Sequence, residues 1–163
     1  MIIMLNVRVR GVDTTIRDIT RCSDELHDGA RNGVNNAAKY LMEKIVAKFG
    51  VYQPTGGDPK GYGAWKKLKI ETIMKKVKHG YSSAPLIMTG ATKGSFSVKE
   101  GGIGRLAASV SSSSDALAYQ VYGAPGANVP MRDPVRVTAK EEKDKCHDIV
   151  AEAIFKKIGG SIS

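Results

Sequence analysis

One apolar stripe dominates the first third of the chain. Apolar or small residues recur every three or four positions from Ile16 to Phe49, with charged residues between them. This spacing predicts a single amphipathic helix that begins near Thr15, runs for about nine turns and is stopped by Gly50. Such a helix would be about 50 Å long at about 1.5 Å per residue, which is more than a small sheet covers. We therefore expect part of the stripe to contact another subunit.

The remaining pattern predicts a sheet and a closing helix. Apolar and polar residues alternate at 2–9, 94–99, 105–112 and 118–122, and a glycine-rich turn joins the middle two segments. The residues from Thr138 to Glu141 match a capping box, and the apolar positions from Cys146 to Ile158 predict a C-terminal helix. The expected fold class is α+β, with both helices packed on an antiparallel sheet of about four strands.

Length and composition predict one domain that spans residues 1–163. Residues 51–64 include four glycines and two prolines, which predicts a flexible loop. Cys22 and Cys146 both fall on apolar helical stripes, so we expect buried free thiols. No stretch approaches the roughly 20 apolar residues of a membrane span, and the alternating N-terminus does not resemble a signal peptide.

The stretch from Ala118 to Pro134 is expected to run from a strand, through a glycine loop, into a stiff arm. Pro130 and Pro134 restrict the backbone on either side of Arg132 and Asp133, so these side chains would lose little freedom on binding. Neighbouring side chains of an extended arm point to opposite sides, which leaves Asp133 poorly placed to pair with Arg132. We expect Arg132 to contact a neighbouring subunit. The alternative is that both residues belong to an ordinary surface loop.

Positive charge is concentrated in one segment. The chain carries a net charge of +9, and a large share of it lies between residues 61 and 80, where one acid, Glu71, accompanies six lysines. These are Lys66, Lys67, Lys69, Lys75, Lys76 and Lys78. Such a patch is typical of contact with a polyanion, here non-specific contact with DNA. The alternative for each single lysine is a solvated helix face.

No motif in the sequence predicts catalysis. The glycines at 102 and 104 imitate a dinucleotide fingerprint, but serine-rich strand sequence follows them instead of a helix. Asp24, His27 and Asp28 lie within about one helical turn, where a solvated acidic turn is the better interpretation than a metal site. The sequence therefore predicts a protein that is not an enzyme and that has no catalytic residue, cofactor or metal.

Four motifs in a fixed order resemble those of a known family. They are Trp65-x-x-Leu68 with Thr72, Pro85-Leu86-Ile87-x-Thr89-Gly90, Tyr119-x-x-Tyr122-Gly123, and Val129-Pro130-Met131-Arg132-x-Pro134. Over roughly residues 14–158 the chain resembles the tail-completion and neck proteins of tailed phages, a group that includes the HK97 gp10-like and Mu-type virion morphogenesis proteins.

The resemblance implies a structural virion protein, assembled in the cytoplasm of the host bacterium. It implies a homo-oligomeric ring, with a hexamer expected, that joins tail to head around the DNA channel as a neck, tail-completion or tail-terminator protein. Its partners would be other neck and tail proteins, with no membrane involved. The residues expected at the subunit interface are Trp65, Tyr122, Pro130, Met131, Arg132 and Pro134.

Two further hypotheses compete with the ring. The basic segment and Trp65 also suit a monomeric or dimeric nucleic-acid-binding module without enzymatic activity. A hydrolase or nuclease is disfavoured because no set of ligands or nucleophiles is apparent. The size of the protein in solution distinguishes the ring from the binding module.

Overall fold

The structure is a computed structural model that describes residues 12–100 and 106–159. Its elements, in chain order, are α1 (Val12–Ala47), α2 (Ile70–Lys78), α3 (Ala91–Gly94), β1 (Phe96–Lys99), β2 (Ser109–Ser112), α4 (Asp115–Tyr122), the 3-10 turn η1 (Pro125–Ala127), α5 (Pro134–Glu141) and α6 (Lys143–Gly159). The class is mixed helix and strand, with a long N-terminal helix and C-terminal helices, as predicted.

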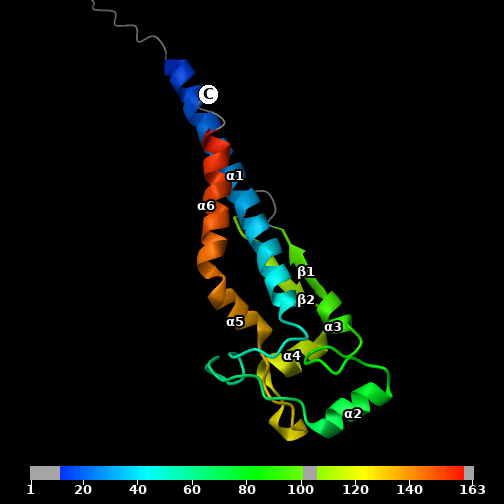
Figure 1. The fold of residues 1–163 in the computed structure, drawn as a ribbon. Helices are drawn as coiled ribbons and strands as arrows, with labels where there is room; N and C mark the ends of the chain where they lie inside the picture. Colours follow the sequence, from blue (N-terminus) through cyan, green and yellow to red (C-terminus); the bar gives the residue numbers. More distant parts are fainter. Residues whose placement is uncertain (1–11, 101–105, 160–163) are drawn as a thin grey trace, which may run out of the picture.

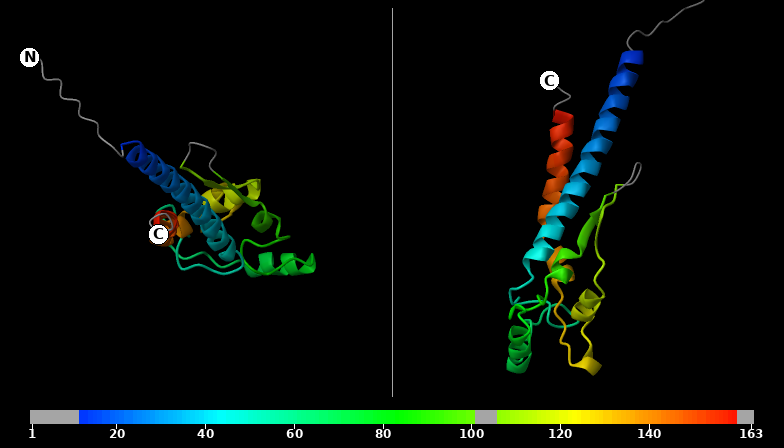
Figure 2. Two further views of the ribbon diagram at one scale, coloured as in Figure 1. Left: turned by 90° about the horizontal axis from the view of Figure 1, so that it is seen from above. Right: turned by 90° about the vertical axis from the view of Figure 1, so that its right-hand side faces the viewer.

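The long helix α1 has 36 residues and forms the axis of the molecule (Figure 1). Helix α6 runs beside it, and the β1–β2 hairpin lies on its other side (Figure 2). Gly29 and Gly33 allow α1 and α6 to pack backbone against backbone, because a Cβ atom at Gly33 would lie 2.8 Å from the Cα of Val150. The first turns of α1 extend past the end of α6 (Figure 2).

A small core lies at the C-terminal end of α1. Ile45 and Phe49 pack with Leu117 and Val121 of α4, and apolar side chains from the hairpin and the 84–90 segment contact this cluster. Phe49 meets Phe96 of β1 edge to face, with ring centroids 5.7 Å apart. The sheet and α4 therefore cover only the lower part of the α1 stripe.

The sheet is smaller than predicted. Among the described residues it consists of β1 and β2, which pair antiparallel with Val98 opposite Val110. These strands confirm the predicted hairpin but are shorter than predicted at 94–99 and 105–112, because Gly94 belongs to α3 and residues 106–108 are not in a strand. The strand predicted at 2–9 lies outside the described residues, so four strands are not found in the part of the chain that the structure describes.

The strand predicted at 118–122 is wrong, because these residues belong to α4. Leu117 and Val121, one helical turn apart, are buried together, while Tyr119 and Tyr122 are exposed. The period of two rested on Tyr119 and Val121, which point in different directions on a helix. Gly123, with a φ of 71°, follows the helix.

Helix α5 does not begin where the capping box was predicted. Asp133 is its N-cap and Pro134 its first residue, whereas Thr138 lies inside the helix and donates its hydroxyl to Pro134 O at 2.6 Å. The apolar stripe predicted for the C-terminal helix is present and half-buried, but it packs against α1. The prediction that this helix packs on the sheet is wrong, because the two-stranded sheet lies on the other side of α1 (Figure 2). Cys146 on this stripe is half-buried, but Cys22 on α1 is exposed, so the expectation of a buried thiol is wrong for Cys22.

Residues 51–64 contain no helix or strand, as predicted, but several internal bonds close the loop. The Asp58 carboxylate accepts hydrogen bonds from the amides of Lys60, Tyr62 and Gly63. Backbone bonds join Gly57 to Gly63 and Trp65 to Gln53. The mobility of this loop stays a prediction, although these contacts favour an ordered turn.

Candidate functional site

The predicted arm is built into the subunit instead of projecting from it. Arg132 is 4% exposed, and its Nε and Nη2 donate to the carbonyl of Lys66 at 3.2 and 2.9 Å. Its backbone amide donates to Gln120 O at 2.7 Å. Within one chain the guanidinium of Arg132 already joins the arm to the basic segment, whereas its contact with a neighbouring subunit stays a prediction.

Asp133 is also buried, and its side chain caps the N-terminus of α5. Its Oδ1 accepts the amides of Val135 and Arg136 at 2.9 and 3.0 Å, and its Oδ2 pairs with Nε of Arg136. The prediction that Asp133 does not neutralise Arg132 is confirmed. The sequence contained the relevant signal, since an aspartate directly before a proline suits an N-cap followed by a first helical residue.

The arm and the glycine loop meet above Trp65. The amide of Asp133 donates to Gly56 O at 2.9 Å, and a Cβ atom at Gly56 would lie 2.7 Å from Asp133 O and 3.1 Å from Nε1 of Trp65. Trp65 is buried, and within the described part of the chain its Nε1 has no hydrogen-bond partner. Loop, tryptophan and arm thus form one packed unit.

The six predicted interface residues therefore differ in what they can offer a neighbour. Arg132, Trp65 and Pro134 are buried in the single subunit, and Pro130 and Met131 are half-buried. Tyr122 is widely exposed, with the guanidinium of Arg136 5.8 Å from its ring centroid. The structure brings the arm and Trp65 together, but mainly for the stability of the fold.

The basic segment is divided between solvent and structure. Five of its six lysines are exposed, whereas Lys76 donates its Nζ to Ala84 O at 2.6 Å. Desolvation, together with the positive charge of Arg132, lowers the pKa of Lys76. Burial lowers the pKa of Arg132 as well. Lys76 therefore holds α2 to its own subunit, and the other five lysines are available to a partner.

Helix α2 itself has no buried residue. Ile70, Met74 and Val77 fall on one face and are 75%, 66% and 59% exposed. An apolar face on a helix normally packs against something. Sequence reasoning missed this exposed face, although its spacing was visible beside the lysines.

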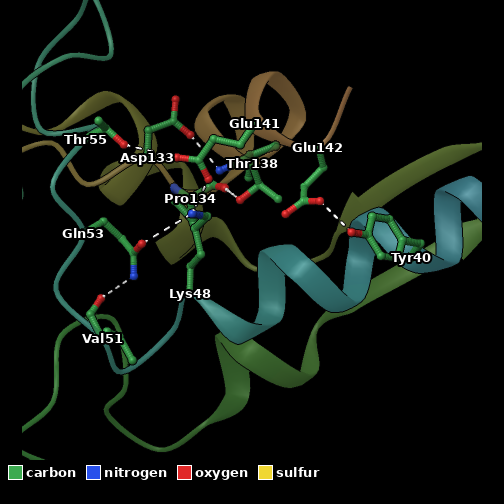
Figure 3. A network of polar contacts seen from close by, with 11 residues as sticks. Tyr40, Lys48, Val51, Gln53, Thr55, Asp133, Pro134, Thr138, Glu141 and Glu142 are labelled. Carbon is green, nitrogen blue, oxygen red and sulfur yellow. Dashed lines mark hydrogen bonds and ion pairs between the residues drawn. The ribbon is translucent and has the colours of Figure 1, made fainter. Parts of the chain in front are cut away.

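A second polar cluster lies where α5 meets α6 (Figure 3). Glu141 accepts Nζ of Lys48 at 2.6 Å, and Glu142 accepts the hydroxyl of Tyr40 at 2.6 Å. Lys48 also reaches Oε1 of Gln53 at 3.4 Å. Two sequence-distant segments, 40–53 and 141–142, are thus joined at the lower end of α1, which fixes the direction in which α6 leaves α5.

The Tyr40–Glu142 contact makes a testable prediction. The hydrogen bond to Glu142, followed by desolvation, raises the pKa of Tyr40 to about 12. The folded state therefore holds this proton more tightly than the unfolded state, and the contact's contribution to stability is present below the ordinary tyrosine pKa and lost as the pH rises towards 12. Ultraviolet absorbance titration should show a late-titrating tyrosine that disappears in Tyr40→Phe and titrates earlier in Glu142→Gln. An unchanged titration in Glu142→Gln would contradict the assignment.

An open cleft of about 630 Å³ lies between α1 and α6. Its lining is rich in amide and charged groups, namely Asn32, Asn35, Asn36, Lys39, Glu100, Glu152, Lys156 and Lys157. Lys39 and Glu100 pair across it at 2.6 Å, and both side chains are about half exposed. Among the described residues, no histidine, cysteine or serine that could act as a nucleophile or base lines this cleft.

Within residues 12–100 and 106–159, no three histidine, cysteine or acidic side chains gather as a metal site would require. None of the described helices combines the length and apolar character needed to cross a bilayer. No family model, curated protein or solved structure matches the chain.

Proposed function

We propose that the chain is a structural subunit of a tailed-phage virion, which assembles into a closed homo-oligomeric ring at the head–tail interface. Six subunits are the expected order. The order and residues of the four motifs described above support the family. The observation that carries the assembly is the exposure of apolar helix faces at both ends of an elongated subunit.

The exposed apolar residues are not scattered singly. Ile70, Met74 and Val77 share one face of α2, and Ile19 and Leu26 share one face of the part of α1 near its N-terminus, where they are 65% and 46% exposed. Clustered apolar surface on a small protein usually marks an interaction site. A subunit with two such surfaces is suited to repeated association with identical neighbours, whereas a monomer would leave both surfaces exposed to solvent.

The exposed lysines support a position beside DNA. Lys66, Lys67 and Lys69 lie before or at the start of α2 and are all exposed. Lysine ammonium groups without a geometric fork attract phosphate without reading bases. A ring that surrounds a DNA channel needs this kind of contact, because the DNA that passes through it has no fixed sequence.

Reversing the charge of these three lysines should weaken DNA binding in a salt-dependent way. In the triple variant Lys66→Glu, Lys67→Glu and Lys69→Glu, the slope of log K against log salt for duplex DNA should fall by roughly 3, since each phosphate contact contributes about 0.9. The bond from Arg132 to Lys66 uses a backbone carbonyl and survives the change.

The matched control reverses three exposed lysines of α6, Lys143, Lys145 and Lys156, for the same change in net charge. If both variants lost DNA binding equally, the effect would reflect net charge and not the basic segment. Preference of the wild-type protein for one duplex sequence would contradict non-specific contact.

The competing function is a basic nucleic-acid-binding module without enzymatic activity. Sedimentation velocity and negative-stain images of the purified protein separate the two. The ring proposal expects concentration-dependent assembly into closed particles. A monomer that binds DNA tightly and never associates, either alone or on tail components, would favour the binding module.

A further inference from the structure

We propose that the apolar face of α2 in one subunit docks on the exposed face formed by Ile19, Cys22 and Leu26 of α1 in the next subunit, so that the ring is assembled by a head-to-tail contact. This inference rests on the proposed ring and specifies the surfaces that build it. The occupant of each face is therefore a second copy of this chain.

The α2 face has a defined border. With about 3.6 residues per turn, Ile70, Met74 and Val77 form one stripe. Lys78 and Glu71 lie along one edge of it, and Lys75 lies farther round the helix on the same side. Lys76 lies on the opposite flank, where its bond to Ala84 O ties the helix to its own subunit. The stripe is consequently directed outward, with positive charge beside it.

The α1 face has the same pattern with the opposite charge. Ile19, Cys22 and Leu26 recur at helical spacing in the N-terminal half of α1, and all three are exposed. Asp18 and Glu25, two turns apart, lie along one edge of this stripe. From Asp18 to Asp28 the helix carries four acids and one arginine, Arg21. Two of the acids are paired within the helix, Glu25 with Arg21 at 4.0 Å and Asp28 with Arg31 at 2.7 Å, which leaves Asp18 and Asp24.

Charge decides which faces pair. The net charge of α2 is positive and that of residues 18–28 is negative. An α2–α2 or an α1–α1 contact would therefore join surfaces of like net charge, which is disfavoured. Pairing α2 with α1 matches apolar stripe with apolar stripe and lysines with acids. The surface Lys–Glu pairs would add specificity more than affinity.

The two faces lie at opposite ends of the subunit (Figure 1). The α2 face and the α1 face of one subunit therefore cannot pack against each other. After a first contact, one of the two subunits keeps a free α1 face and the other keeps a free α2 face. Contacts between two different surfaces propagate from copy to copy and form a ring when the rotation closes.

Cys22 permits a direct test by cross-linking, because it is exposed in the middle of the α1 face. The full-length variants Ile70→Cys, Met74→Cys and Val77→Cys would be concentrated, oxidised mildly and separated on non-reducing gels. At least one variant should form a ladder of covalent dimers, trimers and larger species. The ladder should disappear when Cys22→Ser is added, and the wild-type protein should form none.

Three results would overturn the inference. Cross-linked dimers in the wild-type protein would show that α1 faces α1. Covalent species that stop at the dimer in every variant would show a reciprocal two-fold pair instead of a head-to-tail chain. Absence of cross-links in all three variants would show that the faces do not meet.

A charge placed in the stripe provides an independent measurement. Met74→Glu should weaken self-association by roughly 30-fold, the loss typical of a central interface residue. Its melting temperature should stay near that of the wild type because the side chain is exposed in the subunit. Lys143→Glu, which is exposed on α6, is the control and should associate normally.

The inference and the proposed function can fail separately. Closed rings in negative stain that tolerate Met74→Glu and give no ladder would remove the α2–α1 contact and leave the ring. A ladder accompanied only by open chains would establish the contact and remove the ring.

Discussion

Replacing Arg132 with alanine is expected to lower the free energy of unfolding of the isolated subunit by about 2–4 kcal/mol. The guanidinium is buried and donates twice to Lys66 O, so alanine removes both of these donors and leaves space beneath the arm. For a domain of this length the melting temperature should fall by roughly 5–15 °C. Thermal denaturation followed by circular dichroism measures the change.

Two further variants make this prediction specific. Arg132→Lys keeps the charge but loses the planar fork, so it should remain clearly destabilised. Arg31→Ala removes a partly exposed arginine whose partner, Asp28, is one turn away, and should change stability by less than about 1 kcal/mol. Normal stability of Arg132→Ala combined with failed assembly would show instead that Arg132 belongs to an interface.

The second large effect is expected at the contact between α1 and α6. Gly33→Ala should destabilise the subunit by about 1–3 kcal/mol, although alanine is intrinsically the better helix former by about 1 kcal/mol. The added methyl group would lie 2.8 Å from the Cα and 3.0 Å from the O of Val150, and a backbone neighbour cannot rotate away. The helices would have to separate along their length.

The neighbouring position supplies the control for this variant. Asn32→Ala changes an exposed side chain of the same helix and should leave stability unchanged or slightly raised. Chemical denaturation of both variants gives the comparison. A stabilised Gly33→Ala would contradict the close packing of α1 on α6.

The sequence was most informative where one period persisted. The stripe from Ile16 to Phe49 predicted α1 because a repeat over many turns has no competing interpretation. The hairpin was also predictable, since Phe96 and Val98 alternate with serine and lysine. At 118–122 the segment was too short for its period to be decided, and burial of Leu117 with Val121 selected the helix.

The candidate site was less predictable because burial is a tertiary property. Nothing local indicates that the carbonyl of Lys66 would lie beside Arg132, a contact between residues 66 positions apart. The prolines around Arg132 predicted a rigid arm, but they gave no sign that the Arg132 side chain would be buried inside the subunit. The apolar positions of α2 were visible in the sequence, but their exposure depends on what the rest of the chain leaves uncovered.

Electron cryomicroscopy of tailed particles that contain this chain tests the proposed function most directly. The account predicts density for identical copies arranged as a closed ring, six being expected, around the DNA channel between head and tail, with α2 of each copy against α1 of the next. An isolated monomer, a two-fold dimer or a location away from the head–tail interface would contradict it.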